Sequence, residues 1–204
     1  MGSVKTDARR GRPRDARADE AIIQATLELI AERGIHEFRT EDVATRAGVG
    51  KGAIYRRYPS KDELVTAAIG ALVDEQIVVP DTGSTRDDLL ALMREAVELY
   101  RRSVPGRLMP NLVSAMAQRP DLARALRDGF LAKRRDSLTQ VLRRGIRRGD
   151  LRDDLDLELA LDVLGGPLFY RLLITGGPID GRLAEGVAEL MLRGFAPTEK
   201  ERPR

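Results

Sequence analysis

The residues best suited to bind a charged polymer lie together near the N-terminus, at positions 51–58. They combine three cationic side chains, two phenolic hydroxyls and two small residues: Lys51, Gly52, Ala53, Tyr55, Arg56, Arg57 and Tyr58. Cations and hydroxyls contact phosphate oxygens and base edges, and small residues let a helix approach DNA closely. The pattern favours a helix that enters a major groove. The alternative is an ordinary basic surface helix, because charged faces are usually just solvated.

Two short helices joined by a glycine turn would position these side chains. Thr40 is expected to cap the first helix, and Gly48 to end it, because glycine adopts a left-handed backbone without steric cost. The second helix covers residues 51–58, anchors itself in the core through Ile54, and ends before Pro59. Helix, glycine turn and helix make the helix-turn-helix layout.

Two further helices are expected to enclose this pair. A helix over residues 17–33 carries two neighbouring apolar stripes, which predicts a wide buried face, and Phe38 is expected to fill the small core. Ser60 and Glu63 form a capping box that opens a helix running to about residue 77. This last helix would connect the head to the rest of the chain.

Positive charge is concentrated at one end of the chain. The 204 residues carry a net charge of only +3. Residues 1–17 and residues 39–61 each hold six cations against two carboxylates, which gives +4 for each segment and leaves −5 for the remainder. Such an uneven distribution is typical of a nucleic-acid-binding face.

The N-terminal arm contains a short DNA-binding signal. Arg10, Gly11, Arg12 and Pro13 spell the core of an AT-hook, followed by Arg14. Arginine in a narrow A·T-rich minor groove gains from its negative potential, and Pro13 is expected to keep the arm out of a helix. The alternative is a disordered basic tail that adds only nonspecific attraction.

The composition argues against an enzyme, a metal site and a membrane span. There is no cysteine, and the single histidine, His36, falls in an expected loop. No nucleophile elbow, phosphate-binding glycine loop, secretory signal or long apolar run is present, so we expect a cytoplasmic protein without cofactor or metal. The acidic residues at 150–158 could suit a hard cation, but a charged turn before a helix is the favoured interpretation.

The remainder of the chain predicts a helical body. Helices are expected from Ser84 onward, with one from Pro120 to Arg148 whose outer face is rich in arginine. That face could be a second nucleic-acid surface, but interleaved carboxylates favour a solvated face. Residues 157–174 form the most apolar helix, with a kink expected at 165–167, and residues 180–195 form the last one.

The head segment resembles the DNA-binding segment of the TetR family of bacterial transcription regulators. The matching residues are Thr40, Ala44, Ala47, Gly48, Val49, Gly52, Tyr55, Tyr58, Lys61 and Leu64. The resemblance covers about residues 18–66, and Gly50 departs from it, where the family often has a capping serine. It implies an all-α fold with a helix-turn-helix head joined by a long helix to a helical bundle. The expected parts are an arm (1–16), the head (17–62), a ligand-binding and dimerisation body (63–197) and a tail (198–204).

The resemblance also implies which residues act. Lys51, Gly52, Tyr55, Arg56 and Tyr58 would lie at the groove, with Ala53 between them, while Thr40 and Lys61 hold phosphates. A pocket for a small apolar or amphipathic ligand would draw on Met93, Val97, Tyr100, Met109, Leu112, Met116, Phe130, Phe169 and Tyr170, although such residues are more often core. A homodimer would pack through Leu161, Leu164, Leu168, Leu172, Leu183, Val187, Leu190 and Met191, with an intramolecular core as the alternative.

Two functions are therefore in view. The first is a dimeric regulator, with repression as the favoured output, that binds a palindromic double-stranded operator and is released by its ligand. The second is an architectural protein that prefers A·T-rich DNA and has no ligand control. The sequence does not specify the operator, the ligand or the regulated genes.

Overall fold

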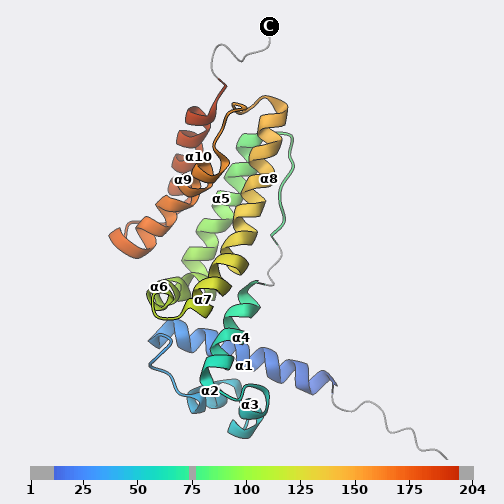
Figure 1. Ribbon diagram of the computed structural model, residues 1–204, viewed down its shortest axis with the longest axis vertical. Helices are drawn as coiled ribbons and strands as arrows, with labels where there is room; N and C mark the ends of the chain where they lie inside the picture. The colour runs from blue at the N-terminus through green and yellow to red at the C-terminus, as the bar shows by residue number, and fades with distance from the viewer. Residues whose placement is uncertain (1–11, 74–76, 198–204) are drawn as a thin grey trace, which may run out of the picture.

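The computed structural model describes residues 12–73 and 77–197, and within these ranges the chain is helical with no β-strand. Figure 1 shows a small head, a connecting helix and a larger body. The elements, in chain order, are α1 (Arg12–Arg33), α2 (Thr40–Ala47), α3 (Lys51–Arg57), α4 (Lys61–Val73), α5 (Thr85–Arg102), α6 (Val104–Met116), α7 (Pro120–Arg124), the π-helical η1 (Ala125–Leu131), α8 (Ala132–Arg148), α9 (Leu157–Tyr170), the π-helical η2 (Arg171–Thr175) and α10 (Gly181–Phe195). No helix within the described ranges is long and apolar enough to cross a bilayer.

The head packs α1, α2, α3 and the start of α4 around one small core. Ile22, Phe38, Val43, Ile54 and Leu64 are almost completely buried there. Gly48 ends α2 with a left-handed backbone (φ 66°), and the amide of Val49 donates to the carbonyl of Ala44 at 3.0 Å. The sequence prediction of two short helices with a glycine turn is confirmed.

The helix caps explain where several elements begin. The Glu63 amide donates to Ser60 Oγ at 3.1 Å, so the predicted Ser60 cap is present. The Asp87 amide donates to Ser84 Oγ at 3.2 Å, so Ser84 caps α5 in the same way. At α2, however, Arg39 takes the N-cap position and Thr40 is already helical. The Asp42 carboxylate accepts the Arg39 amide at 2.9 Å and so supplies the cap that was expected from Thr40.

Three predicted boundaries differ from the structure. Helix α1 begins at Arg12, five residues earlier than expected, because proline is well tolerated in a first helical turn. Residue 77 lies outside α4, whose described part ends at Val73. The β-branched run at residues 77–79 disfavours helix, and Pro80 restricts the residue before it to extended backbone. Helix α9 continues through residues 165–167, so the interruption expected there is absent, while the expected kink stays a prediction. Gly176 ends the following η2, as predicted.

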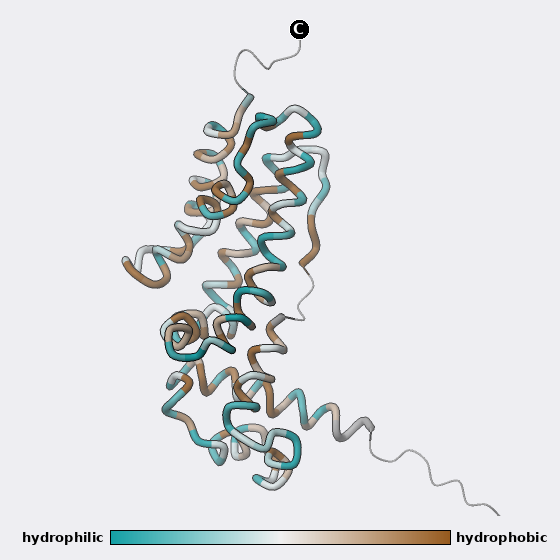
Figure 2. Tube along the Cα trace, viewed as in Figure 1, coloured by the Kyte–Doolittle hydropathy of each residue, from teal (hydrophilic) through white to brown (hydrophobic). Residues whose placement is uncertain are grey.

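The body is built around α5, α8, α9 and α10, which lie beside one another above the head (Figure 1). Helix α6 meets α5 so closely that a Cβ on Gly106 would lie 2.4 Å from the Leu99 carbonyl oxygen. Glycine is therefore required at this crossing. Figure 2 shows apolar residues recurring along the helices of the body, and these form the buried faces that pack together.

A buried ion-pair network fixes the segment between α4 and α5 to the body. Asp88 is completely buried and accepts hydrogen bonds from the amide and the hydroxyl of Thr82, both at 2.8 Å. Arg144 and Arg148 of α8 lie 3.5 and 3.7 Å from the same carboxylate. Arg144 also donates to the carbonyl of Pro80. We call Thr82, Asp88, Arg144 and Arg148 the Asp88 network.

Candidate DNA-binding face and ligand cavity

Helix α3 presents a small exposed face at the end of the head. Ile54 is buried beneath it, while Lys51, Gly52, Tyr55 and Arg56 are exposed. We call these four exposed residues the recognition face. Helix α3 has seven residues and one buried anchor, so its position depends on its neighbours, and the pairing of Arg57 with Asp19 joins it to α1.

The cations of the head are divided between holding the fold and facing solvent. Arg46 of α2 binds both oxygens of Glu32 in α1, at 2.7 and 2.8 Å, and Arg57 of α3 pairs with Asp19 of α1. These pairs fix α2 and α3 against α1. Arg56 makes no ion pair with any residue in the described ranges. It is therefore the arginine of α3 best placed to contact DNA.

Lys51 lies on the recognition face but is paired within the chain. Its ammonium binds the Glu41 carboxylate of α2 and lies 5.6 Å from the centre of the Tyr55 ring. The hydrogen bond to Lys51 lowers the pKa of Glu41, and the same contact raises the pKa of Lys51, so both groups are charged at neutral pH. Lys51 must exchange Glu41 for a phosphate or a base in order to bind DNA.

Two residues expected at phosphates are engaged within the head, Lys61 by hydrogen bonds and Thr40 by burial. Lys61 donates to the carbonyls of His36 and Phe38, at 3.0 and 2.8 Å, and its ammonium lies 4.3 Å from the Phe38 ring centre. Burial is the main cause that lowers its pKa. Thr40 is 7% exposed and lies within the packed head. These positions favour roles in holding the loop before α2 and the start of α4.

The other predicted contacts fall into two groups. Ala53 and Tyr58 are half-buried, and burial raises the pKa of the Tyr58 hydroxyl. Arg10 lies outside the described residues, and Arg12 and Arg14 belong to the first turns of α1, where their side chains are not described. Arg12 and Pro13 are helical, so these two residues do not have the extended conformation that was expected for the arm.

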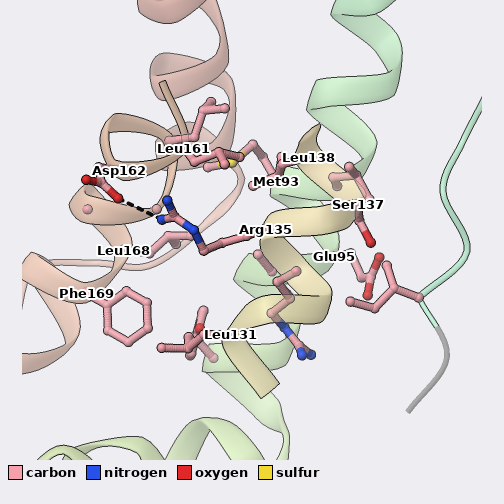
Figure 3. Close-up of a pocket in the computed structure, with 18 residues that line it drawn as sticks. Met93, Glu95, Leu131, Arg135, Ser137, Leu138, Leu161, Asp162, Leu168 and Phe169 are labelled. Carbon is pink, nitrogen blue, oxygen red and sulfur yellow. Dashed lines mark hydrogen bonds and ion pairs between the residues drawn. The ribbon is translucent and has the colours of Figure 1, made fainter. Parts of the chain in front are cut away.

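The body contains a cavity of about 410 Å³ between α5, α8 and α9 that is partly open to solvent. Figure 3 shows Met93, Leu138 and Leu161 gathered at one end and Leu131 with Phe169 at the other. Ile77, from the segment before α5, also lines it. A largely apolar cavity of this size with a few polar groups is typical of a small-molecule site.

Three of the nine residues predicted for the pocket line this cavity: Met93, Tyr100 and Phe169. Val97, Met109, Leu112 and Phe130 are buried in the core, Met116 packs against it, and Tyr170 is 60% exposed. These six residues do not line this cavity, since apolar residues at helical spacing serve the core equally well, and their part in ligand binding stays a prediction.

Sequence reasoning missed the α8 wall of the cavity. Arg134, Arg135 and Leu138 line it. The Arg135 guanidinium reaches across to α9, where it binds Asp162 at 2.7 Å (Figure 3). It also binds Glu158 of the same helix. The sequence did contain a signal for this wall. Spacings of three and four place four residues on one helix face: Leu131, Arg134, Arg135 and Leu138. Because two of these residues are charged arginines, the sequence favoured a solvent-exposed face, and the wall was not predicted.

The arginine-rich face of α8 is neither a uniform solvated face nor a free nucleic-acid surface. Arg135, Arg144 and Arg148 pair with carboxylates of neighbouring elements, while Arg143 and Arg147 are exposed. The acidic residues before α9 also have defined partners. Asp150 accepts the Thr85 hydroxyl at 2.7 Å, Asp154 pairs with Arg152, and Asp156 caps α9 by accepting the Leu159 amide at 3.1 Å.

The eight residues predicted for a dimer interface are mostly occupied within one chain. Leu161, Leu164, Leu168, Leu183 and Val187 are each at most 7% exposed, so these five have almost no surface left for a partner. Leu172 and Met191 are half-buried, and Leu190 is 70% exposed. The exposed large apolar residues of this region are instead Leu159, Val163, Tyr170, Ile174 and Leu190.

A helix-turn-helix head with an exposed basic second helix, joined to a helical body, defines a DNA-binding regulator class. Family comparison gives the same result. Residues 22–68 match the model described as bacterial regulatory proteins of the tetR family, and residues 79–191 match the tetracyclin repressor-like C-terminal domain. The chain belongs to the TetR family of transcriptional regulators, which are not enzymes. The boundary predicted at residue 62 stays a prediction.

Relatives extend over nearly the whole chain. The uncharacterised regulator YdeS of Bacillus subtilis is 33% identical over 190 residues, covering 92% of this chain and 93% of that protein. The DNA-binding transcriptional repressor TetR of Mycobacteroides abscessus is 33% identical over 192 residues, covering 90% and 96%. Among solved structures, the TetR-family regulator SCO0332 is 31% identical with a TM-score of 0.63, covering 89% of this chain and all of that one.

Proposed function

We propose that this regulator is a dimeric repressor in the cytoplasm that binds a partly palindromic operator and is released by a small molecule. The observation that carries the proposal is the pairing of an exposed, rigidly held recognition face with a separate cavity in the body. The relative from Mycobacteroides abscessus is named a repressor, which supports the same output here.

The dimer is supported by an exposed apolar stripe on the C-terminal helices. Leu159, Val163, Tyr170 and Ile174 recur at spacings of four, seven and four along α9 and η2, which places them near one face. Leu190 of α10 is exposed in the same region. Two such helices from each protomer would form a four-helix interface, and a two-fold axis would set two heads on paired half-sites.

Release by a ligand is supported by the position of Ile77. This residue lines the cavity and follows closely after α4, the helix that joins the head to the body. Two polar contacts also join the parts. Asn111 of α6 donates to the Ile30 carbonyl of α1 at 2.9 Å, and Arg119 binds Asp62 of α4 at 2.7 Å. A ligand that prefers one arrangement of these contacts would change the spacing of the two heads.

Selection of bound sequences from a random duplex pool tests DNA recognition. The selection is run at 50 mM and 200 mM salt, because phosphate attraction alone depends steeply on salt. We expect one inverted repeat at both concentrations. Recovery of A·T-rich sequence without a dyad would favour an architectural protein, the second candidate, which rests on the basic arm.

Sedimentation of Leu190→Asp tests the dimer. Placing a charge on the exposed stripe should yield monomers that keep the helical content of the wild type, since this side chain does not support the protomer core. Val78→Asp is the matched control, because Val78 is 84% exposed and lies outside the stripe. A Leu190→Asp dimer as stable as the control would contradict this interface.

A further inference from the structure

Tyr100 is the polar group that distinguishes the cavity wall. It is 7% exposed, and its ring stands edge-on to Phe169 with ring centres 5.5 Å apart. Its hydroxyl makes no hydrogen bond with any residue in the described ranges. The hydroxyl is not among the buried side-chain atoms of the described residues that lack a hydrogen-bond partner, so it keeps accessible surface. The remaining surface of this side chain borders the cavity that it lines.

The other hydroxyl of the wall is already satisfied. Ser137 is 5% exposed and donates to the Lys133 carbonyl of its own helix at 3.0 Å. A ligand that reached Ser137 would gain less, since the serine proton is already engaged. Tyr100 is therefore the wall hydroxyl with a proton to donate.

The charges around the cavity balance. The lining contains two carboxylates, Glu95 and Asp162, and two guanidiniums, Arg134 and Arg135. Arg135 is held by Asp162 and Glu158, while Arg134 stacks over Phe130, with 3.8 Å from its guanidinium carbon to the ring centre. Because two carboxylates and two guanidiniums line it, an ionised ligand would give a largely apolar site a net charge, which is costly. The lining thus favours an uncharged ligand over an anionic amphipath.

We propose that the cavity takes an uncharged, mostly apolar ligand with one hydrogen-bond acceptor, such as a ketone, to which the Tyr100 hydroxyl donates. This proposal rests on the proposed function in one respect, namely that the cavity binds a ligand. It adds the chemical class of the ligand and the residue that selects it.

The state of the phenol fits this role. Burial raises the pKa of Tyr100 to about 12, so the hydroxyl keeps its proton throughout the physiological range. A protonated phenol can donate to a carbonyl, whereas a phenolate could not. The edge-on contact with Phe169 fixes the ring, so little conformational entropy is lost when the hydrogen bond forms.

Binding of Prodan, a neutral fluorescent naphthyl ketone, tests the hydrogen bond directly. Its emission shifts to the blue when its carbonyl loses a hydrogen bond. We expect the wild type to bind Prodan and Tyr100→Phe to bind it about 3- to 10-fold more weakly, with blue-shifted emission. Tyr58→Phe is the matched control, because it removes the same atom from a side chain of the head that does not line the cavity. Equal affinity and emission in wild type and Tyr100→Phe would overturn the proposal.

Three competitors of nearly one shape separate acceptor from charge. 2-Acetylnaphthalene should displace Prodan from the wild type about 3- to 10-fold better than 2-ethylnaphthalene, and this advantage should vanish in Tyr100→Phe. 2-Naphthoate should be the weakest competitor. Tighter binding of 2-naphthoate than of the ketone would overturn the uncharged class, and binding of no probe at all would overturn the ligand class altogether.

These assays use the full chain without DNA, so they fail separately from the proposed function. Thermal unfolding of Tyr100→Phe, expected to be close to that of the wild type, shows whether an affinity loss reflects the missing hydroxyl. If the operator selection yields an inverted repeat but the cavity shows no preference for the ketone, the proposed regulator function stands and only the ligand class is rejected. If the ketone binds as expected but no inverted repeat is recovered, the ligand class stands and the proposed operator recognition is rejected.

Discussion

The head and the body use their arginines differently. In the head, Arg46 and Arg57 pair with α1 and hold the helices that present the recognition face, which leaves Arg56 toward solvent. In the body, Arg144 and Arg148 surround a buried carboxylate, and Arg135 bridges two walls of the cavity. Positive charge near a DNA-binding helix therefore overstates the charge available to DNA, and an arginine-rich helix need not be a DNA surface.

The largest expected effect concerns the body. Asp88→Ala removes the buried carboxylate of the Asp88 network, although both arginines keep Asp81 as a partner. The lost hydrogen bonds and ion pairs should cost about 2 kcal/mol of unfolding free energy. Denaturant unfolding measures this loss. Asp153→Ala, which removes an exposed carboxylate, should be close to wild type. If Asp88→Ala lowered the unfolding free energy as little as Asp153→Ala does, the ion pairs of Arg144 and Arg148 would contribute no more to stability than exposed charges.

The network also predicts how the body responds to acid. Burial acts to raise the pKa of Asp88, but the hydrogen bonds from Thr82 and the charges of Arg144 and Arg148 outweigh it, so the pKa lies below its ordinary value of 3.8. A lowered pKa means that this contribution is present above pH 3.8 and is lost as the pH falls through the folded-state value. The stability gap between wild type and Asp88→Ala should narrow below that pH.

In the head, Arg56 should matter most for DNA. Arg56→Ala should weaken operator binding roughly 10-fold or more, because it removes an exposed cation with no intramolecular ion pair in the described ranges. Fluorescence anisotropy at fixed salt measures the change. Arg143→Ala removes an exposed arginine of α8 and should bind almost normally. Equal losses would mean that general charge, not the recognition face, governs affinity.

A cavity variant separates ligand binding from DNA binding. A Cβ at Gly165 would meet no atom within 4 Å, although this residue lines the cavity. Gly165→Leu should therefore occupy part of the cavity and weaken Prodan binding about 10-fold while leaving operator affinity unchanged. Gly70→Leu adds the same side chain at an open position of α4 and should bind the probe normally. Unaltered Prodan binding in Gly165→Leu would place the probe elsewhere.

The smallest effect tests the internal pairing of Lys51. Glu41→Gln removes the partner of Lys51 and one negative charge beside the recognition face. Operator affinity should rise about 2- to 5-fold, and the salt dependence should steepen by about one counterion, because Lys51 becomes available to a phosphate. Binding titrations from 50 to 200 mM salt measure both. Lower affinity would show that Glu41 orients Lys51 productively.

The head could be predicted closely because its signals are local. Gly48, Ile54 and Ser60 each act through neighbours within a few residues, and each does in the structure what its type predicts. Errors arose where a local signal had two outcomes. Pro13 suits both an extended arm and a first helical turn, and Thr40 suits both a cap and a buried first residue.

The body was predicted as a set of helices but not as a site. Met93, Tyr100 and Phe169 were expected in the pocket together with Met109 and Phe130, which are core. The sequence pattern of one helix predicts which face is buried. It does not predict whether that face packs against other side chains or lines a cavity. The same ambiguity placed buried leucines of α9 and α10 in the dimer interface and left the exposed stripe unassigned.

The sequence by itself determined the helical class, the helix-turn-helix and the family, because these follow from residue types at short spacing. Only the tertiary structure decided which cations are free and where the cavity lies. Arg46 finds Glu32, Lys51 finds Glu41, and Arg135 finds Asp162 across 14, 10 and 27 residues of chain. Ion pairs and cavities depend on distances between elements far apart in the chain, and no spacing within one helix encodes those distances.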